Sequence, residues 1–107
     1  MHKVARRASF QADVIHQFTW YFQEAGENIA WRFEEAVNVT LVRLSQNPTL
    51  GRPRHFRDVR LQNLHSFQVT APFERFLVFF RINDNTITME RLMEGSRNLS
   101  RRLVDTA

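Results

Sequence analysis

The segment Arg75-Phe76-Leu77-Val78-Phe79-Phe80-Arg81-Ile82-Asn83 decides the fold class of this chain. Side chains alternate between the two faces of a β-strand, so its even-numbered residues share one face and its odd-numbered residues share the other. Both sets are apolar at the centre of the segment, and arginines stand near its ends. A strand that is apolar on both faces is typical of the middle of a sheet with covering elements on each side. The segment therefore predicts a central strand.

Two further strands are predicted beside this one, over 64–70 and 86–93. The turn before the central strand contains Pro72, and the turn after it is the tight Asn83-Asp84-Asn85. Such residues favour turns, and strands joined by short turns pair in opposite directions. A short strand is also predicted at the start of the chain, over 3–8. The expected sheet is therefore small and mainly antiparallel.

A first helix is predicted directly after the N-terminal strand. Ser9 is its predicted N-cap, and Asp13 is expected in the first turn, where a negative charge suits the helix dipole. Gly26 is expected to end the helix. Its apolar residues recur three or four positions apart and form one face: Phe10, Val14, Phe18 and Tyr21.

A second helix is predicted to begin at Glu27 or Asn28. It should end at Asn47-Pro48, because proline disfavours a helical conformation in the residue before it. Because the link between the helices is very short, the two form an antiparallel hairpin. The predicted core face of the second helix consists of Ala30, Phe33, Val37, Leu41 and Leu44.

The rest of the chain completes the predicted architecture. Segment 49–58 is expected to be a basic loop, since glycine and proline punctuate it and arginine is frequent. A short final helix is predicted over 97–104. The order β-α-α-β-β-β-α predicts an α+β fold, with an N-terminal strand, a helical hairpin packed on a small mainly antiparallel sheet, and a short C-terminal helix. The 107 residues fit a single domain over 1–107.

Composition narrows the classes of function. The chain has no cysteine, and no stretch approaches the roughly 18 apolar residues of a membrane span. We therefore expect a soluble cytoplasmic protein that does not engage a membrane. The net charge is +4, and 14 of the 15 basic residues are arginine. Such a surface suits nucleic acid or an acidic protein partner, or it simply solubilises an aromatic-rich domain.

No metal or cofactor site is predicted from the residues. The four histidines are scattered, without the spacing of a metal-binding motif. Carboxylates such as Glu34 and Glu35 form no recognisable catalytic pair and are interpreted as solvated surface. We therefore expect the protein to use neither a metal nor another cofactor.

The two tryptophans point to an interface. At about 100° per residue, Trp20 and Trp31 each lie more than about 100° from the centre of the core face of its helix. Val39 and Val42 lie on the side of Trp31. Large apolar residues away from the core usually mark an interaction surface, so these four are predicted to bind a partner. The alternative is that the C-terminal helix covers the hairpin.

Four motifs occur in order along the chain. They are Ser9-x-x-Ala12-Asp13-Val14, Leu44-x-x-Asn47-Pro48-x-x-Gly51, Phe76-Leu77-Val78-Phe79-Phe80-Arg81 and Arg91-Leu92-x-x-Gly95-Ser96-Arg97-Asn98-Leu99. Together they resemble the ParE/RelE toxin superfamily of bacterial toxin–antitoxin systems, over almost the whole chain. The resemblance implies a small α+β toxin that is neutralised by a cognate antitoxin.

The sequence is more similar to the ParE branch of that superfamily. This resemblance implies a toxin that binds and inhibits DNA gyrase rather than an enzyme, with no catalytic residues of its own. Its expected partner is a ParD-like antitoxin with an acidic C-terminal segment, and operator DNA is then bound only through the antitoxin complex. The residues expected to bind the target are Arg91, Arg97 and Arg101.

The competing interpretation for Arg91 is a structural ion pair, for which Glu74, Glu90 and Glu94 are the candidate partners.

The alternative function is that of a RelE-like, ribosome-dependent mRNA interferase. In that case Arg75, Arg81 and Arg97 would stabilise the charge on the scissile phosphate. Ser66 and Gln68 stand where that branch tends to have lysines, which counts against this function.

A third possibility is an inactive homologue. The sequence departs from the superfamily pattern at Glu94, where histidine is common, and at Asn98, where aspartate is common.

Overall fold

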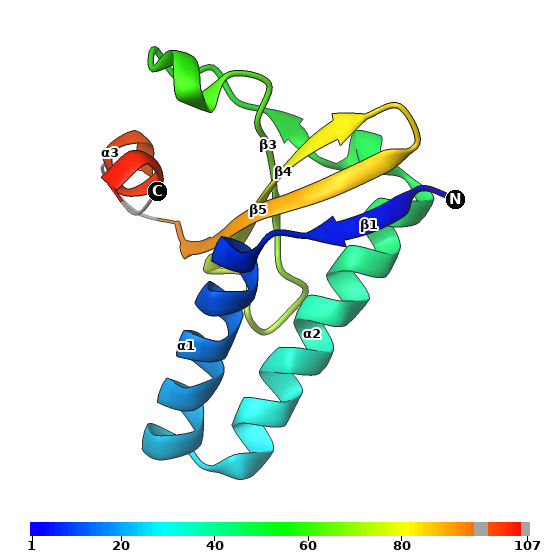
Figure 1. Cartoon of the computed structure of the whole chain (residues 1–107). Coiled ribbons are helices and arrows are strands. Elements are labelled where there is room, and N and C mark those ends of the chain that lie inside the picture. The colour runs from blue at the N-terminus through cyan, green and yellow to red at the C-terminus, as the bar shows by residue number, and fades with distance from the viewer. Residues whose placement is uncertain (96–98, 106–107) are drawn as a thin grey trace.

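A five-stranded sheet lies at the centre of the computed structural model, which describes residues 1–95 and 99–105 (Figure 1). The strand order is β1-β5-β4-β3-β2, and only the pairing of β1 with β5 is parallel among the described strands. The strands are β1 Lys3–Arg6, β2 Arg52–Pro53, β3 His65–Gln68, β4 Phe76–Asn83 and β5 Thr86–Glu94. The predicted α+β class, the mainly antiparallel sheet and the central position of β4 are confirmed.

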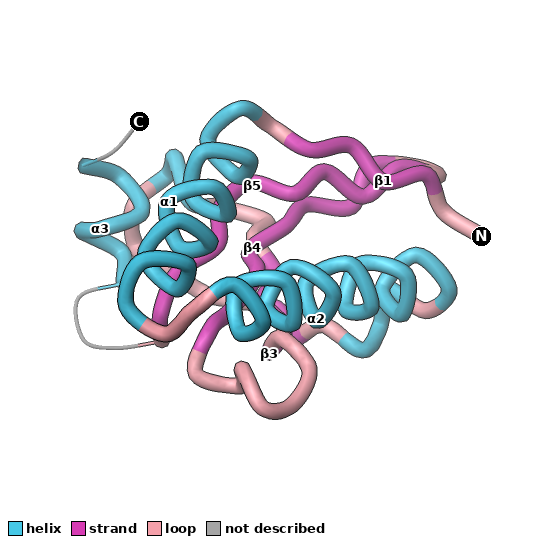
Figure 2. The backbone as a smooth tube through the Cα atoms, turned by 90° about the horizontal axis from the view of Figure 1, so that it is seen from below, coloured by secondary structure: helices cyan, strands magenta, loops and turns pink. Residues whose placement is uncertain are grey.

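A long helical hairpin covers one face of this sheet (Figures 1 and 2). The helices are α1 Ala8–Glu24, α2 Glu27–Gln46 and α3 Leu99–Asp105, with two single-turn 3₁₀ segments, η1 Pro48–Leu50 and η2 Val59–Leu61. The hairpin turns at Gly26, which has a φ of +99°, and its N–H donates to the Tyr21 carbonyl. Glycine adopts such a positive φ without the steric cost other residues carry.

Several predicted boundaries differ from the structure. The first strand ends at Arg6, two residues early, and Arg7 rather than Ser9 occupies the N-cap position of α1. The predicted final helix begins at residues that lie outside the described part of the chain. Segment 49–58 is not entirely a loop, because it contains the end of η1 and the short strand β2, which pairs with β3. A two-residue strand containing proline carries too weak a pattern to be predicted.

The main core lies between the hairpin and the sheet. The even-numbered residues Phe76, Val78 and Phe80 of β4 face this side and are almost fully buried. Phe33 of α2, which is fully buried, stacks edge-on against Phe76 and Phe73. The alternation of apolar residues in β4 and their three- or four-residue spacing in α2 therefore predict the buried faces of both elements correctly.

A second, smaller core lies on the opposite face of the sheet. Phe79 of β4 is fully buried there, together with Leu61, Leu64, Met93 and Leu103. Leu103 belongs to α3, so this helix packs against the far face of the sheet and not over the hairpin. The alternative in which the C-terminal helix covers the hairpin is therefore wrong.

Gly51 is required by close packing. Its φ is −72°, which any residue adopts, but a Cβ atom at this position would overlap Cζ of Phe80 and lie 2.9 Å from Cε1. The residue is buried directly before β2, so the proline–glycine motif serves to let the chain pass over the edge of the Phe80 ring.

We expect Gly51→Ala to lower the free energy of unfolding by about 1–3 kcal/mol, as overpacking of a filled core does. The test is a pair of urea melts, one with Phe80 in place and one in a Phe80→Leu background. Because leucine removes the ring edge, the cost of Gly51→Ala should largely vanish in that background. An equal cost in both backgrounds would refute the packing explanation.

Candidate functional site

The junction between β1 and α1 lies along the edge of β5 and forms hydrogen bonds with it. β1 pairs with β5 only as far as Met89, and β5 continues to Glu94. Beyond that point, groups from α1 take over the hydrogen bonding. The Arg7 N–H donates to the Met89 carbonyl at 3.0 Å, and the Ser9 hydroxyl donates to the Glu90 carbonyl at 2.7 Å. The Leu92 N–H then donates to the Asp13 carboxylate at 2.9 Å.

The Asp13 carboxylate also binds Arg91 through two parallel hydrogen bonds of 2.7 and 2.8 Å. Both side chains are largely buried, with 17% and 13% of their surfaces exposed. Asp13 lies in the second turn of α1, so its predicted role at the helix dipole is wrong, as is the N-cap role of Ser9. Ser9 and Asp13 are four residues apart on α1, and this spacing places both of their side chains along one edge of β5.

A β-bulge in β5 at Glu90 sets the direction in which the side chains of this part of the strand point. Phe79 pairs with Arg91 and Phe80 with Met89, so Glu90 is an extra residue in β5. Its carboxylate lies 3.3 Å from Arg7 and 3.4 Å from Arg81. The bulge therefore gathers an ion-pair network on the face of the sheet that carries α3.

The three arginines considered for RNA cleavage are not gathered into one site. Arg81 donates to the carbonyls of Gln62 and Arg60, at 3.1 and 2.8 Å, and so fastens the η2 loop to the sheet. Arg75 donates to the Tyr21 hydroxyl at 3.0 Å and lies over the Phe76 ring. Arg97 lies outside the described residues.

In the RelE-like branch, lysines tend to stand at the positions of Ser66 and Gln68. Ser66 is buried and accepts a hydrogen bond from Arg54 at 3.3 Å, and Gln68 is an exposed amide at the end of β3. Neither side chain carries the positive charge that the lysines would bring to a scissile phosphate.

The three residues expected to bind the target are also separated. Arg91 is held by Asp13, a partner the sequence had not indicated. Arg101 lies exposed on α3, beside a hollow of about 650 Å³ that it lines together with Arg57 and Arg60. Arg97 again lies outside the described residues. Among the described residues of this set, Arg101 is therefore exposed and Arg91 is largely buried.

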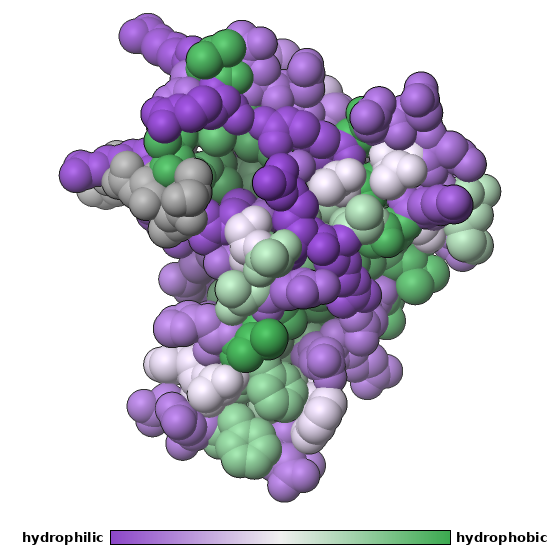
Figure 3. Space-filling model, in the orientation of Figure 1, coloured by the Kyte–Doolittle hydropathy of each residue, from purple (hydrophilic) through white to green (hydrophobic). Residues whose placement is uncertain are grey.

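An apolar surface runs across the two helices of the hairpin. Trp31 is 53% exposed and stacks edge-on against Phe18, with ring centroids 4.9 Å apart. Phe22 is 48% exposed, and the centroid of its ring lies 6.2 Å from that of Phe18. Ile15 follows the same stripe of α1 and is exposed as well. We call Ile15, Phe18, Phe22 and Trp31 the hairpin patch; Figure 3 shows hydrophobic residues gathered at the surface over the hairpin.

The four predicted interface residues do not form one surface. Trp20, which is 46% exposed, lies on the flank of α1 away from Phe18 and packs on Tyr21. Val42 continues the stripe of Trp31 on α2, and Val39 lies about 80° from Trp31, on the outer side of the helix. The prediction that both tryptophans lie outside the core is confirmed.

Phe22 and Ile15 were missed because, off the core face of α1, only the tryptophan was considered as an interface residue. Their angular distance of about 85° for Phe22 and about 105° for Ile15 from the centre of the core face was the available signal.

The family follows from a comparison with known families. A family model of the ParE toxin of the type II toxin–antitoxin system parDE matches residues 4–99. The chain belongs to the ParE toxin family. No curated protein sequence matches it significantly. Within the described residues, no helix is long and apolar enough to cross a membrane.

Several solved structures of low sequence identity share the fold. A chain of the chromosomal ParDE system from P. aeruginosa is 16% identical, with a TM-score of 0.72 over 90% of this chain and 98% of that one. YafQ from E. coli is 12% identical, with a TM-score of 0.54 over 88% and 93%. A chain of the YoeB–YefM complex from Staphylococcus aureus is 12% identical, with a TM-score of 0.53 over 90% and 99%. At these identities the likeness shows the fold alone.

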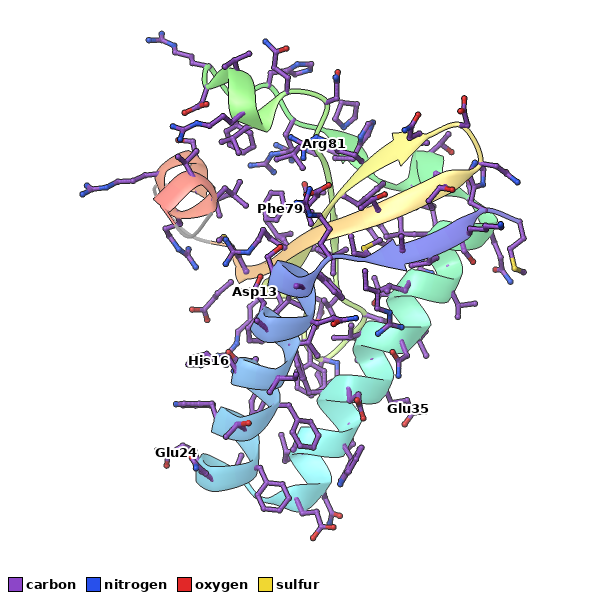
Figure 4. All side chains as sticks on the ribbon, in the orientation of Figure 1. Asp13, His16, Glu24, Glu35, Phe79 and Arg81 are labelled. Carbon is purple, nitrogen blue, oxygen red and sulfur yellow. The ribbon has the colours of Figure 1, made fainter. Side chains whose placement is uncertain are left out.

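We expect Asp13→Ala to lower the free energy of unfolding by about 3–5 kcal/mol, because it leaves the Arg91 guanidinium buried without its carboxylate. Denaturant melts measure this, with Glu24→Ala, an exposed acid near the other end of α1, as the control (Figure 4). A loss below about 1 kcal/mol for Asp13→Ala, or an equal loss for the control, would show that the pair does not hold the fold.

Proposed function

We propose that this ParE-family protein is the toxin of a type II toxin–antitoxin pair and that its antitoxin docks on the hairpin patch. The carrying observation is that Ile15, Phe22 and Trp31 expose 64%, 48% and 53% of their surfaces on one face of the hairpin. Aromatic residues of this size bury a large rigid area and are enriched among the residues that dominate binding energy.

The expected antitoxin is ParD-like, with an acidic C-terminal segment that orders on binding. A segment that folds as it binds covers a large surface at the cost of its own ordering entropy. The hairpin patch offers an apolar stripe with helical spacing, which fits the apolar face of an amphipathic helix. Docking at this surface rests on the apolar stripe and not on charge, because residues 8–46 contain two arginines and five acidic residues. Operator DNA would be recognised through the antitoxin.

We further propose that the toxin acts by binding, with DNA gyrase as its target, and not by cleaving RNA. Cleavage of a phosphodiester needs convergent groups that stabilise charge and move protons. Within residues 1–95 and 99–105, Arg75 and Arg81 are committed to Tyr21 and to backbone carbonyls on different parts of the sheet. That separation supports a binding mode of action.

The activity is tested by two assays on the purified chain. We expect loss of supercoiling by DNA gyrase, reversed by the co-expressed antitoxin, and no cleavage of mRNA on ribosomes. Codon-dependent cleavage that disappears in Arg97→Ala, with gyrase unaffected, would replace this proposal by the RelE-like alternative.

The docking surface is tested by Trp31→Ala. The side chain is half exposed and leaves no closed cavity, so the thermal melt should move little, while antitoxin affinity should fall by about 2 kcal/mol or more, roughly thirtyfold in Kd. Trp20→Ala is the matched control, because Trp20 lies on the flank of α1 away from the hairpin patch, and it should weaken antitoxin binding less than Trp31→Ala. A large stability loss with normal antitoxin binding in Trp31→Ala would place the antitoxin elsewhere.

A further inference from the structure

Charge is divided unequally between the two ends of the molecule. Residues 8–46, which form the hairpin, contain two arginines and five acidic residues. Glu24 lies near the tip of the hairpin and Glu35 points away from the sheet on the outer side of α2 (Figure 4). The hairpin is therefore net acidic, and the rest of the chain carries more positive charge than the total of +4 indicates.

The excess positive charge concentrates where the η2 loop faces α3. Residues 51–61 and 99–105 together contain six arginines and two aspartates. The two segments are held together by Leu61 and Leu103 in the second core. Between them lies the hollow of about 650 Å³, lined by exposed His55, Arg57, Arg60 and Arg101. We call this surface the basic end; it lies opposite the hairpin tip in Figure 1.

Like charges are crowded at the basic end. Burial, and then the nearby charge of Arg52, lower the pKa of the Arg54 guanidinium. Hydrogen bonds from Arg60 lower the pKa of the Asp58 carboxyl to about 2, so this carboxylate stays ionised and is used within the loop. The molecule is 38 Å long, several times the screening length of about 8 Å at physiological salt, so the acids at the hairpin tip do not cancel this charge.

We infer that the basic end binds the phosphate backbone of duplex DNA, without reading its sequence. Clustered arginines neutralise phosphates and release the counterions condensed on nucleic acid. Two features favour duplex DNA over a single strand. One is the higher charge density of the duplex, and the other is that Phe56 is not available for stacking. Phe56 is half-buried in the second core with Arg54 stacked over its ring at 5.6 Å, so it offers no open platform for an unpaired base.

The site is independent of the proposed antitoxin surface. The hairpin patch and the basic end lie at opposite ends of the molecule, on opposite faces of the sheet (Figure 1). A toxin bound at its hairpin would therefore still present arginines to DNA, and failure of one proposal leaves the other standing.

The test measures binding of a fluorescent 20-base-pair duplex of mixed sequence by anisotropy, between 50 and 200 mM NaCl. The logarithm of the binding constant should fall linearly with the logarithm of salt concentration. In Arg57→Gln/Arg101→Gln the slope should become shallower by about 2, roughly one for each phosphate that is no longer neutralised. Arg57→Lys/Arg101→Lys keeps the charge and should keep the slope, which separates charge from folding.

Two controls make the result decisive. Arg32→Gln removes one positive charge, from the hairpin instead of the basic end, and should leave the slope unchanged. A dT20 single strand should bind more weakly than the duplex. The inference is overturned if the duplex does not bind at 50 mM salt, if the glutamine and lysine pairs behave alike, or if Arg32→Gln has the same effect. Tighter binding of dT20 than of the duplex would also overturn it. Antitoxin titrations on the same variants report separately on the hairpin patch.

Discussion

The arrangement of this toxin depends on how α1 closes the edge of β5. β1 is too short to cover that edge, and two side chains of the following helix complete the hydrogen bonding. The Ser9 hydroxyl donates to the Glu90 carbonyl, and the Asp13 carboxylate accepts from the Leu92 N–H and from the Arg91 guanidinium. These bonds fix where the hairpin begins and hold it on one face of the sheet. They also leave no unpaired backbone edge at that point to attract another strand.

That joint separates the two surfaces for which binding is proposed. The hairpin stands away from the sheet and carries exposed Phe22 and Trp31, while the bulge at Glu90 turns its charged network toward α3. Arg81 extends this network to the η2 loop and so holds the basic end in place. A small fold with three glycines thereby presents an apolar surface at one end and a positively charged one at the other.

Local sequence patterns predicted most of the fold, but they did not predict the contacts between α1 and β5. The alternation around Phe79 and the spacing of residues such as Phe33 indicated which faces are buried, because burial follows the strand and helix periods. The Asp13–Arg91 pair joins residues 78 positions apart and depends on a one-residue bulge, neither of which leaves a periodic signal. The same limit applied to the site. Exposure of Trp31 followed from helix geometry, but its contact with Phe18 required the hairpin to be assembled.

The most direct test is the hydrogen exchange rate of the Leu92 amide, measured by NMR on the intact protein. This amide lies on the side of β5 that no strand covers, and only the carboxylate of Asp13 accepts its proton in the described structure. If α1 closes the edge as described, the amide exchanges as slowly as the paired amides at the centre of the sheet, through global unfolding. Exchange as fast as that of an exposed loop amide would contradict the account.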